Sequence, residues 1–136
     1  MSISFPSDEW IKALCVELNQ SQAYRQAAAK WEGDLIFVIE KGGGLDQDHF
    51  LYLDLWHGEC RGARALAGES DANAEFTLGA PLATWKRVIS GQLDPIRALT
   101  GRQLKLKGNL LKIIKTPKAA IELVNCSKEL DTAWPG

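Results

Sequence analysis

The chain has 136 residues, of which 46% are hydrophobic and 24% charged, and its formal net charge is −1. This composition is ordinary for a folded domain and excludes a disordered, collagen-like or disulfide-stabilised chain. No apolar run approaches the roughly 18 residues of a membrane-spanning helix, and Met1–Pro6 lacks the basic segment of a secretory signal. Three distant cysteines, Cys15, Cys60 and Cys126, predict free thiols in a reducing compartment. We therefore expect one cytoplasmic domain over residues 1–136.

The charge is distributed unevenly along the chain. Residues 1–85 carry a net charge of −7, residues 86–118 carry +8, and residues 119–136 carry −2. A basic segment of this kind indicates an anionic partner. A solvated basic edge without a partner is the alternative.

Two helices are expected first. Ser7 is a suitable N-cap, and apolar residues from Trp10 to Leu18 recur at the spacing of one helix face. Ser21 starts a second, alanine-rich helix that we expect to run to about Trp31.

Five strands are expected. Residues 35–39 form an apolar run typical of a central strand that is covered on both faces. Residues 49–57 alternate, with leucines toward the core, and a tight turn at Gly58-Glu59 leads into a strand over 60–66. Alternation over 74–78 and 103–107 predicts the other two strands.

The second half adds short helices. Helices are expected over 81–89, 95–99 and 110–114, followed by a last helix from Pro117. Their expected caps include Asp94, Asn109 and Thr116. The element order predicts an α+β fold, with helices covering one face of a five-stranded sheet. We expect its core to span about residues 5–130 and the tail from Asp131 to be loose.

No catalytic or metal-binding motif stands out. His49 and His57 would lie roughly 26 Å apart on one strand, and Asp54 would point to the opposite face. No nucleophile elbow, P-loop, HExxH or CxxC motif occurs in the sequence. We expect no enzymatic activity, no cofactor and no metal. Nucleic acid is not an expected partner, because aromatic residues do not interleave with the lysines.

Apolar residues are in surplus in the last third of the chain. Leu110, Leu111, Ile113 and Ile114 cannot all face one direction around a short helix. Such a surplus suits a hydrophobic cavity beneath the helices. A helix that is buried on all sides is the alternative.

An ordered set of motifs occupies residues 75–111: Phe76-Thr77, Trp85, Gly91-Gln92-Leu93-Asp94-Pro95, and the run from Gly101-Arg102-Gln103-Leu104-Lys105 to Gly108-Asn109. In this order the sequence resembles the sterol carrier protein type-2-like family, in the form of its stand-alone prokaryotic members, over about residues 5–125. Asn109 stands where the family has Asp, and Asn caps a helix about as well. The peroxisomal tripeptide of eukaryotic members is missing, so peroxisomal targeting is not expected.

The resemblance implies a hydrophobic tunnel between sheet and helices. It also implies non-catalytic binding and carriage of a fatty acid, acyl-CoA, sterol-like molecule or phospholipid. A regulatory or protein-interaction domain with a filled tunnel, or an accessory lipid-presenting domain of an enzyme system, is the alternative. The oligomeric state is left open.

Two sets of site residues follow. We expect the ligand to contact Leu78, Trp85, Ile89, Leu99, Leu104, Leu106, Leu110, Ile114, Ile121 and Val124. We expect an anionic head group or membrane surface to contact Lys105, Lys107, Lys112, Lys115 and Lys118.

Overall fold

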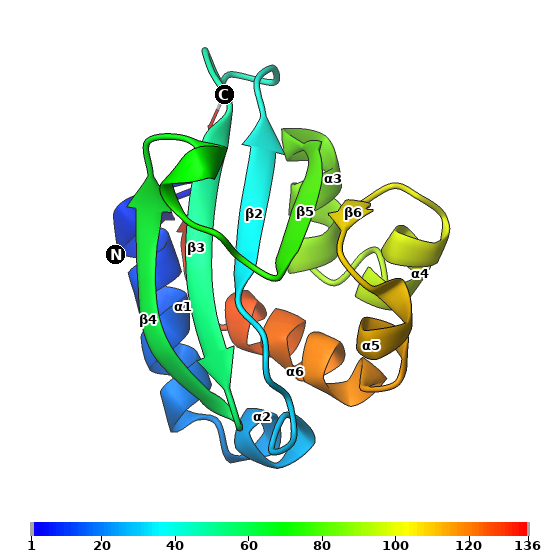
Figure 1. The fold of residues 1–136 in the computed structure, drawn as a ribbon. Helices are drawn as coiled ribbons and strands as arrows, with labels where there is room; N and C mark the ends of the chain where they lie inside the picture. The colour runs from blue at the N-terminus through cyan, green and yellow to red at the C-terminus, as the bar shows by residue number, and fades with distance from the viewer. Residues whose placement is uncertain (1, 136) are drawn as a thin grey trace.

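The computed structural model describes residues 2–135. Five strands form one sheet in the order β4-β3-β2-β5-β6 (Figure 1). Neighbouring strands are antiparallel, except that β2 and β5 run parallel. The strands are β2 (Leu35–Glu40), β3 (His49–Trp56), β4 (Glu59–Leu66), β5 (Phe76–Pro81) and β6 (Lys105–Lys107). The five-stranded sheet predicted from the sequence is confirmed.

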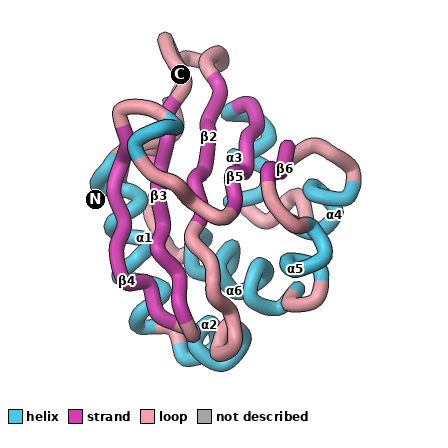
Figure 2. Tube along the Cα trace, viewed as in Figure 1, coloured by secondary structure: helices cyan, strands magenta, loops and turns pink. Residues whose placement is uncertain are grey.

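Six helices accompany the sheet: α1 (Asp8–Gln20), α2 (Gln22–Ala27), α3 (Leu82–Ile89), α4 (Pro95–Thr100), α5 (Leu110–Ile114) and α6 (Pro117–Lys128). In Figures 1 and 2, α1 lies behind β3 and β4, and α6 passes behind the segment that leads into β2, below the lower ends of β2 and β5. The predicted α+β fold with helices on one face is confirmed. On the opposite face, the connection between β4 and β5 crosses the sheet with one helical turn, η1 (Glu69–Asp71).

The strand register places the core between sheet and helices. Leu35 pairs with Leu53 on one side and with Phe76 on the other, so these side chains share the helix-facing side. The predicted leucine face of β3 is correct, since Leu53 is 0% exposed. On the other face Ile36 is 1% exposed, which agrees with a central strand covered on both sides.

The hairpin between β3 and β4 has a two-residue loop, His57-Gly58, one position earlier than expected. Both residues have positive φ, 50° and 81°, as a type I′ turn requires. A Cβ at Gly58 would also lie 2.6 Å from the carbonyl oxygen of Arg25. The turn therefore demands glycine for both conformation and space.

Side-chain caps start four helices as predicted. The side chains of Ser7, Ser21, Asp94 and Asn109 each accept a hydrogen bond from a backbone N–H of the first turn. Thr116 differs, because it precedes α6 but its side chain makes no capping bond. Its expected role as a side-chain cap is wrong.

The end of α2 corrects another expectation. The helix stops at Ala27 and does not continue to Trp31. Beyond it, Glu32 forms a bridge with Trp56, and the backbone N–H of His57 donates to the carbonyl oxygen of Trp31 at 2.7 Å. Because residues 31 and 32 pair with the end of β3, they cannot continue the helix.

The expectation of a loose tail does not hold for residues 131–135. Strand β7 (Thr132–Ala133) pairs in parallel with β1 (Ile3–Ser4). Trp10 Nε1 donates to Thr132 Oγ1 at 2.9 Å, and the Trp134 ring packs on Phe5 with centroids 5.0 Å apart. These contacts fasten the segment after α6 to the segment before α1.

Candidate functional site

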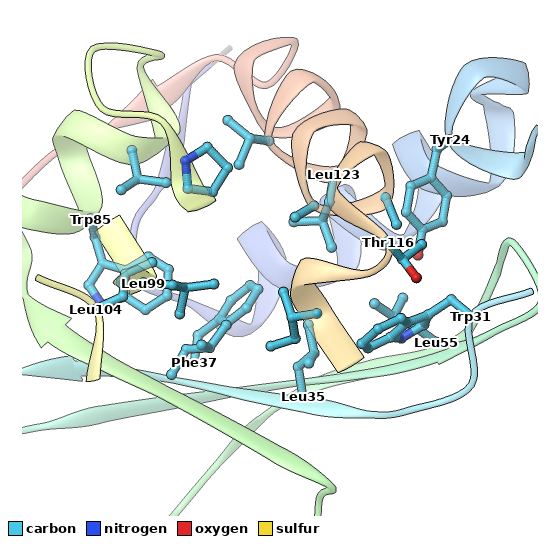
Figure 3. Close-up of a pocket in the computed structure, with 17 residues that line it drawn as sticks. Tyr24, Trp31, Leu35, Phe37, Leu55, Trp85, Leu99, Leu104, Thr116 and Leu123 are labelled. Atoms are coloured by element: carbon cyan, nitrogen blue, oxygen red, sulfur yellow. The ribbon is translucent and has the colours of Figure 1, made fainter. Parts of the chain in front are cut away.

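An apolar cavity lies between the helix-facing side of the sheet and the helices α2 to α6 (Figure 3). Its volume is about 90 Å³, and no side chain that lines it is charged. The wall consists of Tyr24, Trp31, Leu35, Phe37, Leu55, Leu78, Trp85, Val88, Pro95, Leu99, Leu104, Ile113, Thr116, Ala119, Ala120, Leu123 and Val124. Such a wall favours an apolar ligand, because burial of apolar surface is the main driving force that it offers.

Two tryptophans in the wall have their polar atoms satisfied by the backbone. Trp85 Nε1 donates to the carbonyl oxygen of Val38, and Trp31 Nε1 donates to that of Gly33, both at 2.9 Å. The Trp85 ring also packs on Phe37, with centroids 5.0 Å apart. With their N–H groups bonded, both rings offer apolar surface to the cavity.

Three of the five predicted head-group lysines lie in ion pairs. Lys105 and Lys107 each contact a glutamate carboxylate at 3.0 Å. Lys112 contacts Glu75 at 2.7 Å and lies 5.3 Å from the centroid of the Trp31 ring. These pairs reduce the net positive charge that this segment presents.

Lys115 and Lys118 are exposed and form no ion pair within residues 2–135. Lys115 follows Leu111 by four positions at α5, and Lys118 precedes Ile121 by three positions on α6, so each pair shares a helix face. Leu111 and Ile121 are 63% and 38% exposed. We call these four residues the outer α5–α6 face.

A second, polar cleft lies near the ends of β2 and β3 and includes Tyr52, Asp34, Asp54 and Arg61. Tyr52 Oη donates to Asp34 Oδ2 at 2.7 Å, and Arg61 pairs with Asp54 at 3.0 Å. Burial and the contact with Asp34 raise the pKa of Tyr52 to about 12. Within residues 2–135, no three His, Cys, Asp or Glu side chains are grouped as metal ligands. The polar groups of this cleft therefore satisfy one another.

Comparison with protein families matches residues 11–118 to the SCP-2 sterol transfer family. The chain belongs to this family. The resemblance seen in residues 75–111 is thus confirmed, and SCP-2 membership supports lipid binding or transfer as the general function. No curated protein matches the chain significantly.

Solved structures agree with the SCP-2 assignment. The crystal structure of a sterol carrier protein 2 is 42% identical, with 91% of this chain and 97% of that chain covered and a TM-score of 0.85. A conserved hypothetical protein of Thermus thermophilus, described as possibly a sterol carrier protein, is 41% identical, with 92% and 88% covered and a TM-score of 0.84. Sterol carrier protein-2 of Aedes aegypti, solved with palmitate, shares the fold at 16% identity, with 88% and 98% covered and a TM-score of 0.52.

Half of the predicted cavity residues lie in the cavity wall of this SCP-2 domain. Those in the wall are Leu78, Trp85, Leu99, Leu104 and Val124. Those outside it are Ile89, Leu106, Leu110, Ile114 and Ile121. Whether any of the ten contacts a ligand stays a prediction, and so does the extension of the cavity into a tunnel.

Helix geometry explains which residues fall outside. On α5 Ile113 reaches the cavity, whereas Leu110 and Ile114, four positions apart, share a different face. On α6 the wall includes Ala120, and the next residue, Ile121, turns outward. A run of apolar residues does not reveal which of its faces meets the cavity.

The sequence interpretation did not single out Tyr24, Trp31, Leu35 or Phe37. For Leu35 and Phe37 a usable signal existed, because alternate residues of one strand share a face. For Trp31 there was none, since a loop beyond the end of α2 places its ring.

Proposed function

We propose that the protein binds a lipid-like ligand in this cavity and carries it without covalent chemistry. The observation that carries the proposal is a wall in which no side chain is charged. A fatty acid, acyl-CoA, sterol-like molecule or phospholipid offers an apolar body, and each buried methylene contributes about 0.8 kcal/mol before the costs of association. Palmitate bound to the Aedes aegypti protein supports a ligand of this class. The unpaired Cys15, Cys60 and Cys126 support the cytoplasm as its location.

The cavity must widen to hold such a ligand. Its volume of about 90 Å³ lies below the roughly 300 Å³ at the lower end of small-molecule sites. The small volume also favours a second candidate, a regulatory or protein-interaction domain whose cavity is occupied by its own side chains. An accessory lipid-presenting domain of an enzyme system would bind its lipid in the same place.

Native mass spectrometry of the purified protein, followed by titration of delipidated protein with cis-parinaric acid, separates a lipid-binding cavity from one that is filled by its own side chains. We expect a retained lipid or binding at micromolar strength or better. Leu123→Glu, which places a charge in the wall, should weaken binding at least tenfold, whereas Leu111→Glu on the exposed face should not. A protein that retains no lipid and binds no probe would support the filled cavity.

We further propose that the outer α5–α6 face contacts an anionic membrane during transfer. Leu111 and Ile121 can enter the interface of the bilayer while Lys115 and Lys118 approach phosphate groups. Within residues 2–135 no helix is long and apolar enough to cross a membrane, so the proposed contact is peripheral.

Vesicles that contain phosphatidylglycerol test this contact. Replacing Lys115 and Lys118 by Gln should reduce binding about thirtyfold, at about 1 kcal/mol per lost cation near the surface. Lys105→Gln with Lys107→Gln removes the same charge from ion-paired positions and should have a smaller effect. Equal losses in the two double variants, or binding that does not weaken with salt, would contradict the assignment.

A further inference from the structure

We propose that the hydroxyl groups of Tyr24 and Thr116 form a polar anchor in the cavity. This anchor selects lipids whose buried polar group is uncharged, such as an alcohol, over lipids that end in an ionised carboxylate. The inference rests on the proposed lipid binding and specifies the chemical class of the ligand.

The Tyr24 side chain is buried, and its hydroxyl has no hydrogen-bond partner among the described residues. The residue is 1% exposed and lines the cavity, and no hydrogen bond joins its hydroxyl to another group within residues 2–135. All fully enclosed polar side-chain atoms in this part of the chain have partners, so the Tyr24 oxygen keeps some accessible surface, and the residue lines the cavity. By contrast, the hydroxyl of Tyr52 donates to Asp34. A buried hydroxyl without a partner carries a desolvation cost that a bound ligand can remove.

Thr116 supplies a second free hydroxyl. It stands before α6, at the position where Ser7, Asp94 and Asn109 cap their helices, yet its side chain makes no capping bond. The residue lines the cavity. In Figure 3, Tyr24 and Thr116 lie toward the Trp31 end of the cavity, away from Trp85.

Charge decides which polar groups suit this anchor. Burial, with a smaller effect from the nearby Cys60 and Cys126 thiols, raises the pKa of Tyr24, so its hydroxyl remains a neutral donor at physiological pH. No cationic side chain lines the cavity. An ionised carboxylate buried there would therefore lack a counter-charge, which is costly, whereas an alcohol can both donate and accept. The charged group of a fatty acid, phospholipid or acyl-CoA would have to remain outside.

The wall offers two more hydrogen-bonding side chains, Trp31 and Trp85, but both are excluded as anchors. Their N–H groups already donate to backbone carbonyl oxygens at 2.9 Å. The polar contacts that a ligand can gain from side chains are thus confined to one end of the cavity. A ligand with a single polar end would be oriented by them, with its apolar body toward Phe37 and Trp85.

Three ten-carbon probes test the anchor: decan-1-ol, 1-chlorodecane and, at pH 8, decanoate. Their affinities are measured by isothermal titration of the delipidated protein, because cis-parinaric acid itself carries a carboxylate. We expect wild-type protein to bind decan-1-ol at least tenfold more tightly than decanoate. Tyr24→Phe and Thr116→Val should each reduce the preference for decan-1-ol over 1-chlorodecane by about threefold to tenfold, the usual range for one hydrogen bond. Tyr52→Phe, on the far face of the sheet, is the matched control and should leave this preference unchanged.

Thermal unfolding without ligand separates an anchor from a structural residue. Tyr24→Phe removes an unpartnered buried hydroxyl, so its melting temperature should equal or exceed that of the wild type. If all probes bind and the preference for decan-1-ol is the same in wild type and both cavity variants, the anchor is overturned while lipid binding stands. If no probe binds to wild type, the anchor and the proposed function fail together.

Discussion

At Gly108, both the backbone conformation and the packing require glycine. Its φ is +133°, and a Cβ there would lie 2.6 Å from a ring carbon of Phe76 and 3.0 Å from the carbonyl oxygen of Glu75. We expect Gly108→Ala to lower the free energy of unfolding by about 2–4 kcal/mol, from backbone strain and overpacking together. Gly42→Ala isolates the strain, because φ is +121° there and nothing lies within 4 Å of the added carbon. Urea unfolding that shows equal losses in both variants would contradict the packing argument.

Tyr52 gives a pH dependence of stability. Its pKa is raised from 10.0 to about 12, chiefly by burial and then by Asp34. The folded protein therefore keeps the phenol proton above pH 10, where the unfolded chain releases it. The free energy of unfolding should fall as the pH rises from about 10 to 12. Urea unfolding across this range should show a shallower fall in Tyr52→Phe, and identical pH profiles would contradict the assignment.

At the scale of elements, most helices and strands could be predicted from local sequence patterns. Capping by Ser7 and Asp94 and the alternation of β3 depend on neighbours along the chain, so the sequence revealed them. The pairing of β1 with β7 joins two-residue strands from opposite ends of the chain, and no local pattern marks it. The end of α2 is likewise set by distant pairing with β3. For the cavity, composition indicated apolar helices but not which helix faces form its wall.

The β1–β7 pair predicts a stabilising role for the C-terminal segment. A chain that ends at Leu130 loses this pair, the Trp134 contact with Phe5 and the Trp10 bond to Thr132. We expect its free energy of unfolding to fall by about 3–5 kcal/mol, the range for losing a packed tryptophan. Thr132→Val removes only the hydrogen bond and should cost about 1 kcal/mol. Unchanged stability in the shortened chain would show that the segment contributes nothing.

At the scale of the whole molecule, the cavity is a stability cost that the fold retains. At about 24 cal/mol per Å³, an enclosed void of 90 Å³ would cost about 2 kcal/mol, which is an upper bound here because the cavity is partly open. The helical wall of this void is held at one end, because α6 leads into β7 and the β1–β7 pair. At its other end α6 begins at Thr116 without a side-chain cap. This asymmetry suggests that the N-terminal part of α6 moves when the cavity widens.

A variant that fills the cavity tests two effects separately: the change in ligand affinity and the change in the free energy of unfolding. Ala120 lines the cavity on α6, and Ala120→Leu should raise the free energy of unfolding or leave it unchanged, with a gain of up to about 2 kcal/mol. The same change should weaken binding of cis-parinaric acid at least tenfold, because the added side chain occupies the space that the ligand needs. Ala83→Leu, on the exposed side of α3, is the matched control and should leave affinity unchanged. Urea unfolding and probe titration of the three proteins give the answer. Unchanged affinity in Ala120→Leu would place the ligand elsewhere, whereas a loss of both stability and affinity would identify this part of α6 as packed core.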